Sequence, residues 1–465
     1  MSTIALDPVL SHIDTSFDAS VEHLFDLLRI KSISTDPAFK ADCRQAAEWL
    51  VKDLQSIGFD ASVRDTPGHP MVVAHHEGPT DDAPHVLFYG HYDVQPVDPL
   101  NLWENDPFAP AVKDMGNGRK IMTGRGTSDD KGQLMTFVEA CRAYKAVHGK
   151  LPVKVTILFE GEEESGSPSL KPFLEQNKQE LKADCALVCD TGMWDEKTPA
   201  ISVGLRGLVG TEVTVFAADR DLHSGSFGGA AANPIHILSK IVADIHDENG
   251  HITIPGFYDG VEETPSQILQ SWDNLGRTAE NFLGPIGLSV PSGEKGRSVL
   301  ELTWARPTAE VNGITGGYTG DGFKTVIAAQ ASAKISFRLV HKQDPEKIRA
   351  AFHQFVLDRL PADCRAEFAN HGGSPAIQLP YDSSLVNKAK DALSDEWPNP
   401  AVLTAMGGSI PIVGDFDTYL GMESLLVGFG LEDDRIHSPN EKYEITSFHK
   451  GQRSWARILN ALAQK

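Results

Sequence analysis

The chain has 465 residues, with 42 Lys and Arg against 64 Asp and Glu, which gives a formal net charge of −22. Hydrophobic residues make up 41% and charged residues 23% of the chain, a composition typical of folded globular proteins and unlike that of disordered or collagen-like chains. The length suggests two or three domains, and the acidic balance argues against nucleic acid or an anionic membrane as a partner. An acidic excess forms a solvated surface or holds cations.

The cysteine content and the N-terminus indicate a cellular compartment. The five cysteines form no C-x-x-C pair, and this odd, sparse set is unlike a disulfide framework or a zinc ribbon, so we expect a reducing, cytoplasmic environment. Residues 1–20 have no basic stretch followed by an apolar one, and no apolar run approaches transmembrane length. We therefore expect neither export nor membrane insertion.

The first part of the chain alternates helical and strand-like patterns. Apolar residues at helical spacing predict an amphipathic helix over residues 41–57, and further helical patterns cover residues 134–147 and 169–181. Short apolar runs that predict buried strands cover residues 71–74, 85–89, 153–159 and 185–189. This alternation predicts an α/β domain built on a mainly parallel sheet.

The pattern changes near residue 206. Residues 211–216 and 335–339 alternate like half-exposed strands, and Asn233-Pro234 and Asp344-Pro345 each predict the start of a helix. Strand, helix, strand and helix in this order predict a small inserted α+β domain of ferredoxin-like type.

We place the domain boundaries from these patterns. The larger domain has a first part at residues 1–205 and a second part at residues 379–465, with the inserted domain at residues 206–378 between them. Residues 255–322 are rich in Pro and Gly and predict no clear element.

Metal-ligand residue types follow three of the predicted strands. In chain order they are His91 and Asp93, then Glu163 and Glu164, then Asp190. Because the carboxyl ends of parallel strands meet at one edge of a sheet, we expect these side chains to lie close together.

Two further loops carry such residues, with Asp129 in residues 124–132 and His437 in residues 435–441. Taken alone, each cluster is equally well explained by a surface ion pair, a solvated loop or a helix start. Their joint occurrence favours a cation site, because neighbouring carboxylates repel one another unless cations neutralise them.

Seven segments, in order, resemble the motifs of the M20 metallopeptidases, and within that family the non-specific dipeptidase and carnosinase branch. Together they span most of the chain. The segments are GHYDVQP at residues 90–96, GRGTSDDKG at 124–132, EGEEESGS at 160–167, DLHSG at 221–225, ISFRLV at 335–340, GGSIP at 407–411 and HSPNE at 437–441.

The resemblance implies two divalent metal ions per subunit, bridged by Asp129. His91 and Asp190 would complete the protein ligands of one ion, and Glu164 and His437 those of the other. In the family the ions are usually zinc and sometimes manganese, and oxygen and imidazole ligands suit Zn²⁺, Mn²⁺ and Co²⁺ about equally. The resemblance also implies a cis peptide bond between Asp129 and the next residue.

The resemblance assigns catalytic roles to three further residues. Asp93 would orient the imidazole of His91, and Glu163 would be the general base that activates water. The inserted domain would serve as a lid and as the dimerisation domain. His223, within it, would reach the active site of the partner subunit and stabilise the oxyanion.

The resemblance also implies substrate contacts. Arg338 would bind the C-terminal carboxylate of a peptide, and His223, Thr325 and Ser409 would contact the substrate beside it. The expected enzyme is a cytoplasmic, homodimeric hydrolase of dipeptides or short peptides.

Two alternatives remain open. An amidohydrolase or deacylase that acts on N-acyl or modified amino acids could use the same metals. Asp190 favours the dipeptidase, because in the family aspartate at this position accompanies dipeptidase and aminopeptidase activity, and glutamate accompanies carboxypeptidases and deacylases. A catalytically silent metal- or ligand-binding protein is disfavoured because Glu163 and all five expected ligands are present. No G-x-S-x-G, H-E-x-x-H or Walker A motif suggests another chemistry.

Overall fold

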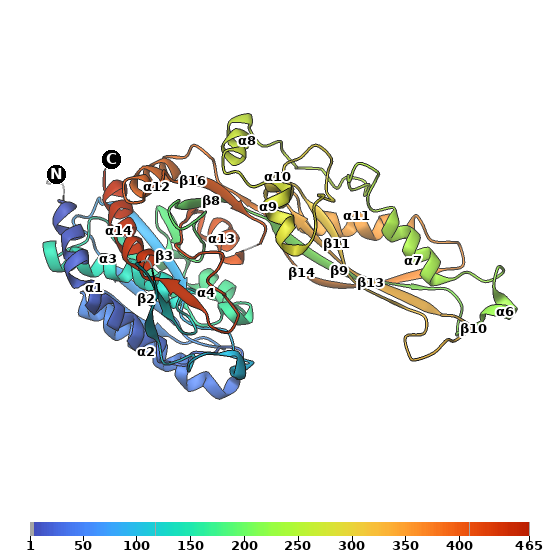
Figure 1. Ribbon diagram of the computed structural model, residues 1–465, viewed down its shortest axis with the longest axis horizontal. Helices are drawn as coiled ribbons and strands as arrows, with labels where there is room; N and C mark the ends of the chain where they lie inside the picture. Colours follow the sequence, from blue (N-terminus) through green and yellow to red (C-terminus); the bar gives the residue numbers. More distant parts are fainter. Residues whose placement is uncertain (1–3, 117, 409, 465) are drawn as a thin grey trace. The chain divides into compact units, whose positions relative to one another are not determined.

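In the computed structural model, which describes residues 4–116, 118–408 and 410–464, the chain forms two compact units (Figure 1). Unit 1 comprises Met1–Val203, Leu379–Thr404 and Asp415–Lys465, and unit 2 comprises Gly204–Gln378 and Ala405–Gly414. The segment Ala405–Gly414 therefore clusters with unit 2, although it lies inside the C-terminal part of the chain.

Unit 1 is built on a mixed sheet. Its strands are β1 (Asp60–Arg64), β2 (Met71–His76), β3 (His85–His91), β6 (Lys154–Glu160), β7 (Cys185–Val188), β8 (Ala200–Leu205) and β17 (Glu423–Leu426), in the spatial order β1-β2-β6-β3-β7-β17-β8. The central pairs β6–β3, β3–β7 and β7–β17 are parallel, whereas β1–β2, β2–β6 and β17–β8 are antiparallel. The prediction of a mainly parallel sheet is thus correct only for the centre.

Short strands extend this sheet and form a second one. β16 (Val402–Met406) pairs with β8, and β15 (Ile377–Gln378) pairs with the last two residues of β8. A separate antiparallel sheet contains β4 (Ala111–Gly116), β5 (Arg119–Thr123) and β18 (Lys442–Glu444) in the order β18-β5-β4. The pairing of β18 with β5 brings the chain before Lys442 beside the chain after Thr123.

The helices of unit 1 confirm two of the three predicted for it. They are α1 (Asp7–Leu28), α2 (Lys40–Ser56), α3 (Lys131–His148), α4 (Leu170–Gln176), α5 (Lys178–Leu181), α12 (Ser384–Ser394) and α14 (Ile445–Leu462), and α13 (Pro411–Asp415) crosses the boundary between the units. α2 and α3 match the predicted helices. The single helix predicted over residues 169–181 is wrong, because the backbone leaves helical geometry at Asn177.

An aromatic cluster fastens β3 to two helices. The rings of Phe88 on β3 and Phe137 on α3 stack with centroids 3.7 Å apart, and Trp455 on α14 meets both rings edge-on. Such pairs contribute about 0.5–1.5 kcal/mol each beyond the burial of their area. The cluster therefore gives a rigid base to the strand that ends at His91.

Unit 2 is an antiparallel sheet with helices packed on it. Its elements are β9 (Gly207–Phe216), β10 (Leu222–His223), α6 (Ser224–Phe227), α7 (Pro234–Ala243), α8 (Ser266–Asp273), α9 (Ala279–Leu283), α10 (Val299–Trp304), β11 (Thr308–Gly316), β12 (Val326–Ile327), β13 (Gln330–Leu339), α11 (Pro345–Leu357) and β14 (Arg365–Ser374). The four long strands lie in the order β11-β13-β9-β14. With α7 after β9 and α11 after β13, this is the βαββαβ arrangement of ferredoxin-like domains.

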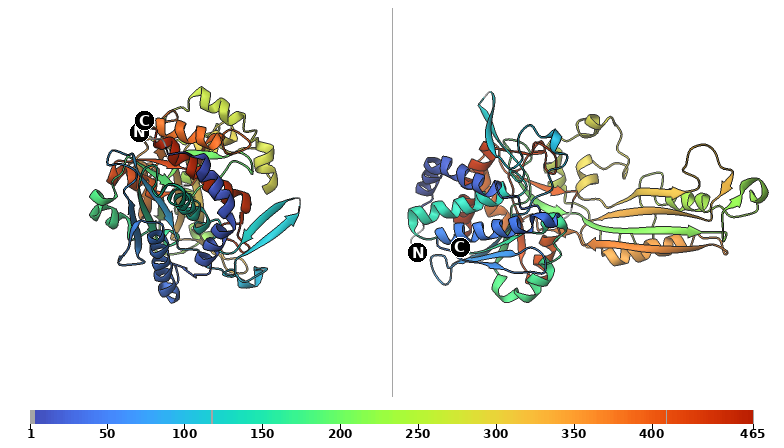
Figure 2. Two further views of the ribbon diagram at one scale, coloured as in Figure 1. Left: turned by 90° about the vertical axis from the view of Figure 1, so that its left-hand side faces the viewer. Right: turned by 90° about the horizontal axis from the view of Figure 1, so that it is seen from below.

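The predicted helix starts in unit 2 are confirmed. The side chain of Asn233 accepts a hydrogen bond from the Ile235 N–H, and that of Asp344 accepts one from the Glu346 N–H. α7 and α11 pack on the sheet through a core that includes Val213, Leu238, Phe337 and Phe352 (Figure 2). Residues 255–322, for which the sequence predicts no element, contain the short helices α8, α9 and α10 and the whole of β11.

All five cysteines are free, and Cys43, Cys141, Cys185 and Cys189 are buried, whereas Cys364 is half-buried. Within the described ranges, no helix has the length and apolar character needed to cross a bilayer.

Candidate metal centre

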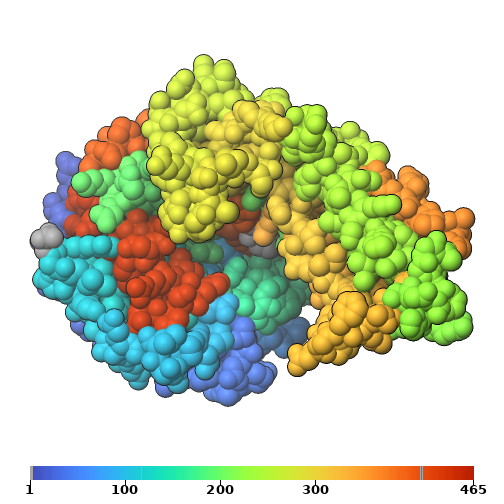
Figure 3. Space-filling model, turned by 45° about the vertical axis from the view of Figure 1, so that its right-hand side comes forward, coloured from blue at the N-terminus to red at the C-terminus, as the bar shows by residue number. Residues whose placement is uncertain are grey.

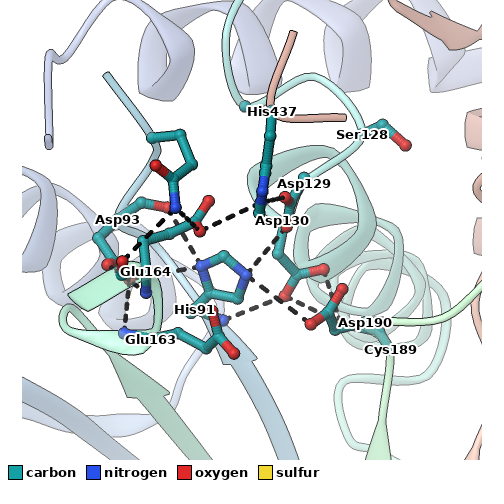
Figure 4. A network of polar contacts seen from close by, with 12 residues as sticks. His91, Asp93, Ser128, Asp129, Asp130, Glu163, Glu164, Cys189, Asp190 and His437 are labelled. Atoms are coloured by element: carbon teal, nitrogen blue, oxygen red, sulfur yellow. Dashed lines mark hydrogen bonds and ion pairs between the residues drawn. The ribbon is translucent and has the colours of Figure 1, made fainter. Parts of the chain in front are cut away.

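The centre of the mixed sheet places several metal-ligand residue types together in unit 1. β3 lies between β6 and β7, and all three strands point the same way. His91 is the last residue of β3, Glu163 and Glu164 follow β6 in a short 3-10 turn, and Asp190 follows β7. Figure 4 shows that these side chains converge with Asp129 and His437. The expectation drawn from the strand ends is confirmed.

The first group contains His91, Asp129 and Asp190. The Nε2 atom of His91 lies 3.1 Å from Oδ1 of Asp129 and 4.0 Å from Oδ2 of Asp190. One donor atom from each residue lies within 4.8 Å of the other two. His91 is fully buried, so this group is held by the sheet itself.

The second group contains Asp129, Glu164 and His437, again with donor atoms within 4.8 Å of one another. The Nε2 atom of His437 lies 2.9 Å from Oδ2 of Asp129 and 3.2 Å from Oε2 of Glu164. Asp129 therefore belongs to both groups, with Oδ1 turned to the first and Oδ2 to the second. The peptide bond between Asp129 and Asp130 is cis, as the resemblance implies.

Asp93 joins the end of β3 to the turn that follows β6. Its Oδ1 atom lies 3.4 Å from Nδ1 of His91, and its carboxylate accepts hydrogen bonds from the backbone N–H groups of Glu163 (3.3 Å) and Glu164 (3.0 Å). The backbone carbonyl of Asp93 lies 3.1 Å from the same imidazole nitrogen. These contacts orient the ring of His91 and hold the two glutamates beside it.

The neighbouring glutamates differ in their contacts. The carboxylate of Glu164 is bound by Gln95 and His437, whereas that of Glu163 has no hydrogen-bond or ion-pair partner among the described residues. Burial raises the pKa of Glu163, and the negative charges of Glu164 and Asp93 add to that effect. Glu164 is therefore held in place, and Glu163 is free to exchange a proton.

The electrostatics of the cluster favour added positive charge. Burial and the Asp129 carboxylate raise the pKa of Asp190 to about 7. The hydrogen bonds to Asp129 and Glu164 raise the pKa of His437 to about 10. In both cases the protonated form gains because the surrounding carboxylates carry uncompensated negative charge.

This donor set fits divalent metal ions. Among the described residues, neither Lys nor Arg forms an ion pair with the carboxylates of Asp129, Glu164 or Asp190. Three carboxylates packed this closely need cations to neutralise them, and carboxylate oxygens with imidazole nitrogens suit Zn²⁺, Mn²⁺ and Co²⁺. The two overlapping groups provide places for two such ions.

The residues expected to contact substrate lie in unit 2, except Ser409, which lies outside the described residues. Arg338, near the end of β13, lines a cavity of about 730 Å³, and its guanidinium has no hydrogen-bond or ion-pair partner among the described residues. His223 and Thr325 lie elsewhere in the unit, side by side, where Ser224 N–H donates to the carbonyl of Thr325. The structure thus brings His223 and Thr325 together but does not bring them to Arg338.

Sequence analysis missed a second arginine in this cavity. The guanidinium of Arg206 donates from Nε to the carbonyl of Gly407 at 3.1 Å and from a terminal nitrogen to that of Leu302 at 3.4 Å. Burial, and next the positive charge of Arg338, lower the pKa of Arg206 to about 10. The LRG sequence around Arg206 gives no signal of this role, because its partners lie about 100 and 200 residues away.

Sequence analysis also missed two groups that support the metal centre. The side chain of Asp130 is fully buried and accepts a hydrogen bond from the N–H of His91 at 3.0 Å and one from the thiol of Cys189. Gln95 donates to Glu164. Both residues stand inside the quoted motifs, but spacing alone does not indicate which partner each side chain meets.

Comparisons with known proteins extend over nearly the whole chain. Residues 87–461 match the family model described as Peptidase family M20/M25/M40. The chain is 31% identical to the Cys-Gly metallodipeptidase dug1 of Schizosaccharomyces pombe, over 99% of each chain. Its fold is similar to that of human carnosine dipeptidase 1 (27% identity, TM-score 0.73, 99% of this chain and 100% of that chain). It is also similar to the M20 family metallo-carboxypeptidase Sso-CP2 from Sulfolobus solfataricus (29% identity, TM-score 0.78, 96% and 99%).

Proposed function

Because this chain belongs to peptidase family M20/M25/M40, we propose that it hydrolyses the peptide bond of dipeptides or short peptides with two divalent metal ions. Membership makes the chain an M20-type metallopeptidase, and the substrate class is supported by relatives such as the Cys-Gly metallodipeptidase. The observation that carries the proposal is the shared position of Asp129, whose two oxygens face two separate groups of donor atoms.

The assignment of the metal ligands follows from the shared position of Asp129. His91, Asp129 and Asp190 hold one ion, and Asp129, Glu164 and His437 hold the other. Zn²⁺ is the expected ion, and Mn²⁺ or Co²⁺ would also fit, because the donor set contains no thiolate. When bound, the ions would polarise the scissile carbonyl and lower the pKa of the attacking water.

Glu163 is the general base in this proposal. Its carboxylate is held beside the cluster by the two hydrogen bonds of Asp93 to the turn, yet it makes no bond of its own among the described residues. One of its oxygens therefore accepts a proton from the attacking water and later gives that proton to the nitrogen of the leaving amine. Asp93 has an orienting role through the imidazole of His91.

The cavity in unit 2 supports recognition of a C-terminal carboxylate. Arg338 and Arg206 both line it, and neither has a carboxylate partner among the described residues, whereas Arg306 in the same cavity is neutralised by Glu294 at 2.9 Å. A carboxylate bound by a guanidinium gains charge-assisted, often bidentate, hydrogen bonds. We assign Arg338 to this contact, with Ser409 as a further substrate-contact residue, and we assign Thr325, which lies beside His223, as a substrate contact made together with His223.

The geometry of unit 2 supports a homodimer in which His223 acts on the partner subunit. His223 pairs with Val326 before β13 begins, and Arg338 lies eight residues after the first residue of β13. At about 3.3 Å per residue, the start of β13, which follows the strand paired with His223, lies about 25 Å from Arg338, whereas an extended dipeptide spans about 7 Å. Figure 3 shows the exposed end of unit 2 where residues near 223 (green) and 325 (gold) gather. One dipeptide therefore reaches both residues only if they come from different subunits.

We also propose that the enzyme is cytoplasmic, which its five free thiols support because a reducing compartment keeps thiols reduced. A substrate panel tests the proposal. The apoenzyme is reconstituted with Zn²⁺, Mn²⁺ or Co²⁺ and given a dipeptide with free termini and the N-acetylated form of the same dipeptide.

We expect hydrolysis of the free dipeptide that is lost with a chelator and restored by metal. Faster hydrolysis of the N-acetylated dipeptide would indicate an amidohydrolase instead. A protein that binds two metals and hydrolyses neither substrate would be a binding protein that keeps the fold.

A further inference from the structure

Two buried carboxylates flank His437 on one loop. We name residues 431–441 the His437 loop and residues 124–130 the Asp129 loop. Asp434 lies three residues before His437 and Glu441 four residues after it, and both are fully buried. Neither belongs to the two groups of metal-ligand atoms. Their hydrogen bonds go mainly to the Asp129 loop.

Glu441 accepts four hydrogen bonds from the Asp129 loop. Its Oε1 atom accepts the backbone N–H groups of Ser128 (2.9 Å) and Asp129 (3.1 Å). Its Oε2 atom accepts the backbone N–H of Gly126 (3.0 Å) and the guanidinium of Arg125 (2.8 Å). The carboxylate therefore holds the peptide group of Asp129 itself, at the residue that both donor groups share.

Asp434 makes a second connection between the same loops. Its Oδ2 atom accepts the hydroxyl of Ser128 and the N–H of Leu431, both at 2.8 Å. Its Oδ1 atom accepts the ammonium of Lys442 at 2.6 Å. The His437 loop is thus fastened to the Asp129 loop on both sides of the histidine.

Between these two points the loop has a further anchor in Asn440, whose side-chain amide donates to the carbonyl of Leu102 at 2.8 Å and accepts the N–H of Glu104 at 2.7 Å. Residues 435–438 are exposed, and the side chain of His437 is 54% exposed. Arg435 and His437 have left-handed backbone geometry, with φ of 58° and 61°, which is unfavourable for a non-glycine residue. Such geometry persists only where the surroundings determine it, and here the surroundings are the two flanking carboxylates together with the contacts of Asn440.

We propose that Asp434 and Glu441 are positioning residues that preorganise His437 against Asp129 and so set the affinity of the second metal site. The inference rests on the proposed function, in which both donor groups bind divalent ions. The first site depends on these residues far less, because His91 and Asp190 stand at the ends of strands of the main sheet.

Asp129 itself keeps other support when the carboxylates are changed. α3 begins two residues after it, and the ammonium of Lys131 donates to the carbonyls of Leu27 and Ile30 at the end of α1. The loss should therefore fall on His437, which has no comparable anchor. Outer groups that orient metal ligands typically change metal affinity by about 10- to 100-fold.

The test measures two Zn²⁺ dissociation constants for the full-length apoprotein, by competition with a chromophoric chelator. Glu441→Gln replaces a carboxylate that accepts four hydrogen bonds with an amide. Asp434→Asn replaces the other buried carboxylate with an amide in the same way. We expect each variant to bind one Zn²⁺, the ion whose binding His437→Ala also weakens, about 10- to 100-fold less tightly, with less than about a threefold change for the other ion. Ser128→Ala removes only the hydroxyl bond to Asp434 and should act in the same direction by a smaller factor.

Glu444→Gln is the matched control. Glu444 is a buried carboxylate three residues after Glu441, but it accepts hydrogen bonds from Arg119 and Lys442 and none from the Asp129 loop. Glu444→Gln should leave both Zn²⁺ dissociation constants unchanged. The melting temperature of each apoprotein shows whether a variant is folded, and Ser128→Ala keeps the test available if the carboxylate variants are not.

Three results are decisive. Selective weakening of one site supports the inference. Unchanged constants, or equal weakening of both sites, overturn it while leaving the proposed function intact. A wild-type protein that binds fewer than two Zn²⁺ overturns the proposed function itself.

Discussion

The side-chain amide of Gln95 donates a hydrogen bond of 2.6 Å to Oε2 of Glu164, the same oxygen that lies 3.2 Å from the imidazole of His437. Gln95 follows His91 by four residues, so one short segment after β3 supplies a member of the first donor group and orients a member of the second. The orientation of Glu164 is therefore set before any ion binds.

Replacing Gln95 should raise the metal requirement of the enzyme. Gln95→Met keeps the length of the side chain and removes the donor, so the carboxylate of Glu164 gains rotational freedom. We expect the metal concentration for half-maximal activity to rise about tenfold. Gln55→Met is the control, because Gln55 donates only to the carbonyl of Ala61, and it should leave the requirement unchanged. An unchanged requirement in Gln95→Met would show that Glu164 needs no such support.

Glu163→Gln should abolish most catalysis and leave metal binding intact. The amide has nearly the shape of the carboxylate but cannot accept a proton from water, so kcat should fall by about 10²- to 10⁴-fold. Metal content measured on the purified variant should stay at the wild-type value, because Glu163 belongs to neither donor group. Full activity with both ions bound would disprove the role of Glu163.

Arg338→Met and Arg206→Met should raise KM for dipeptides with a free C-terminus. A hydrogen bond to a charged group contributes about 1.5–3 kcal/mol, which corresponds to a rise in KM of about 10- to 100-fold. A dipeptide with a C-terminal amide carries no carboxylate, so the same variants should change its KM much less.

Lys334→Met is the matched control for these two variants. Lys334 is an exposed cation on the same strand as Arg338, outside the cavity. Its variant should behave like the wild type with both substrates. Equal effects of Arg206→Met on the acid and on the amide would mean that Arg206 acts only through its bonds to Gly407 and Leu302.

Subunit mixing should show whether His223 acts on the partner. His223→Ala and Glu163→Gln homodimers should each be nearly inactive. When the two are co-expressed in equal amounts, half of the dimers are mixed, and each mixed dimer has one complete site, so activity should recover to about a quarter of the wild type. His223 is exposed and its change should not affect folding. If the mixed preparation is as inactive as the two parent homodimers, His223 acts either within its own subunit or not in catalysis at all.

The sequence predicted those site residues that directly follow a strand, because their positions depend only on the local residue pattern. Parallel strands end at one edge, so His91, Glu164 and Asp190 could be brought together from their positions after strand-like runs. Asp129 and His437 stand in loops, where their residue types made them candidates, and only the family resemblance assigned them as ligands. The contacts of Glu441 with the Asp129 loop span more than 300 residues, and no local pattern indicates such a pair.

The errors in the fold have physical reasons. β2 and β3 are joined by only eight residues, which is too few for the helical crossover that parallel neighbours need, and β2 therefore lies antiparallel beyond β6. The helix predicted over residues 169–181 stops at Asn177, whose side-chain amide donates to the carbonyl of Phe173 at 2.8 Å. Asparagine competes for backbone hydrogen bonds in this way and ends helices.

The distribution of the five thiols has a practical consequence. Burial raises the pKa of Cys43 and of Cys185 to about 12, and Cys141 and Cys189 are equally shielded. Cys364, just before β14, is the one cysteine that is not buried. A maleimide fluorophore should therefore label the native enzyme at a single position in unit 2, which provides a spectroscopic reporter of that unit without any engineered residue.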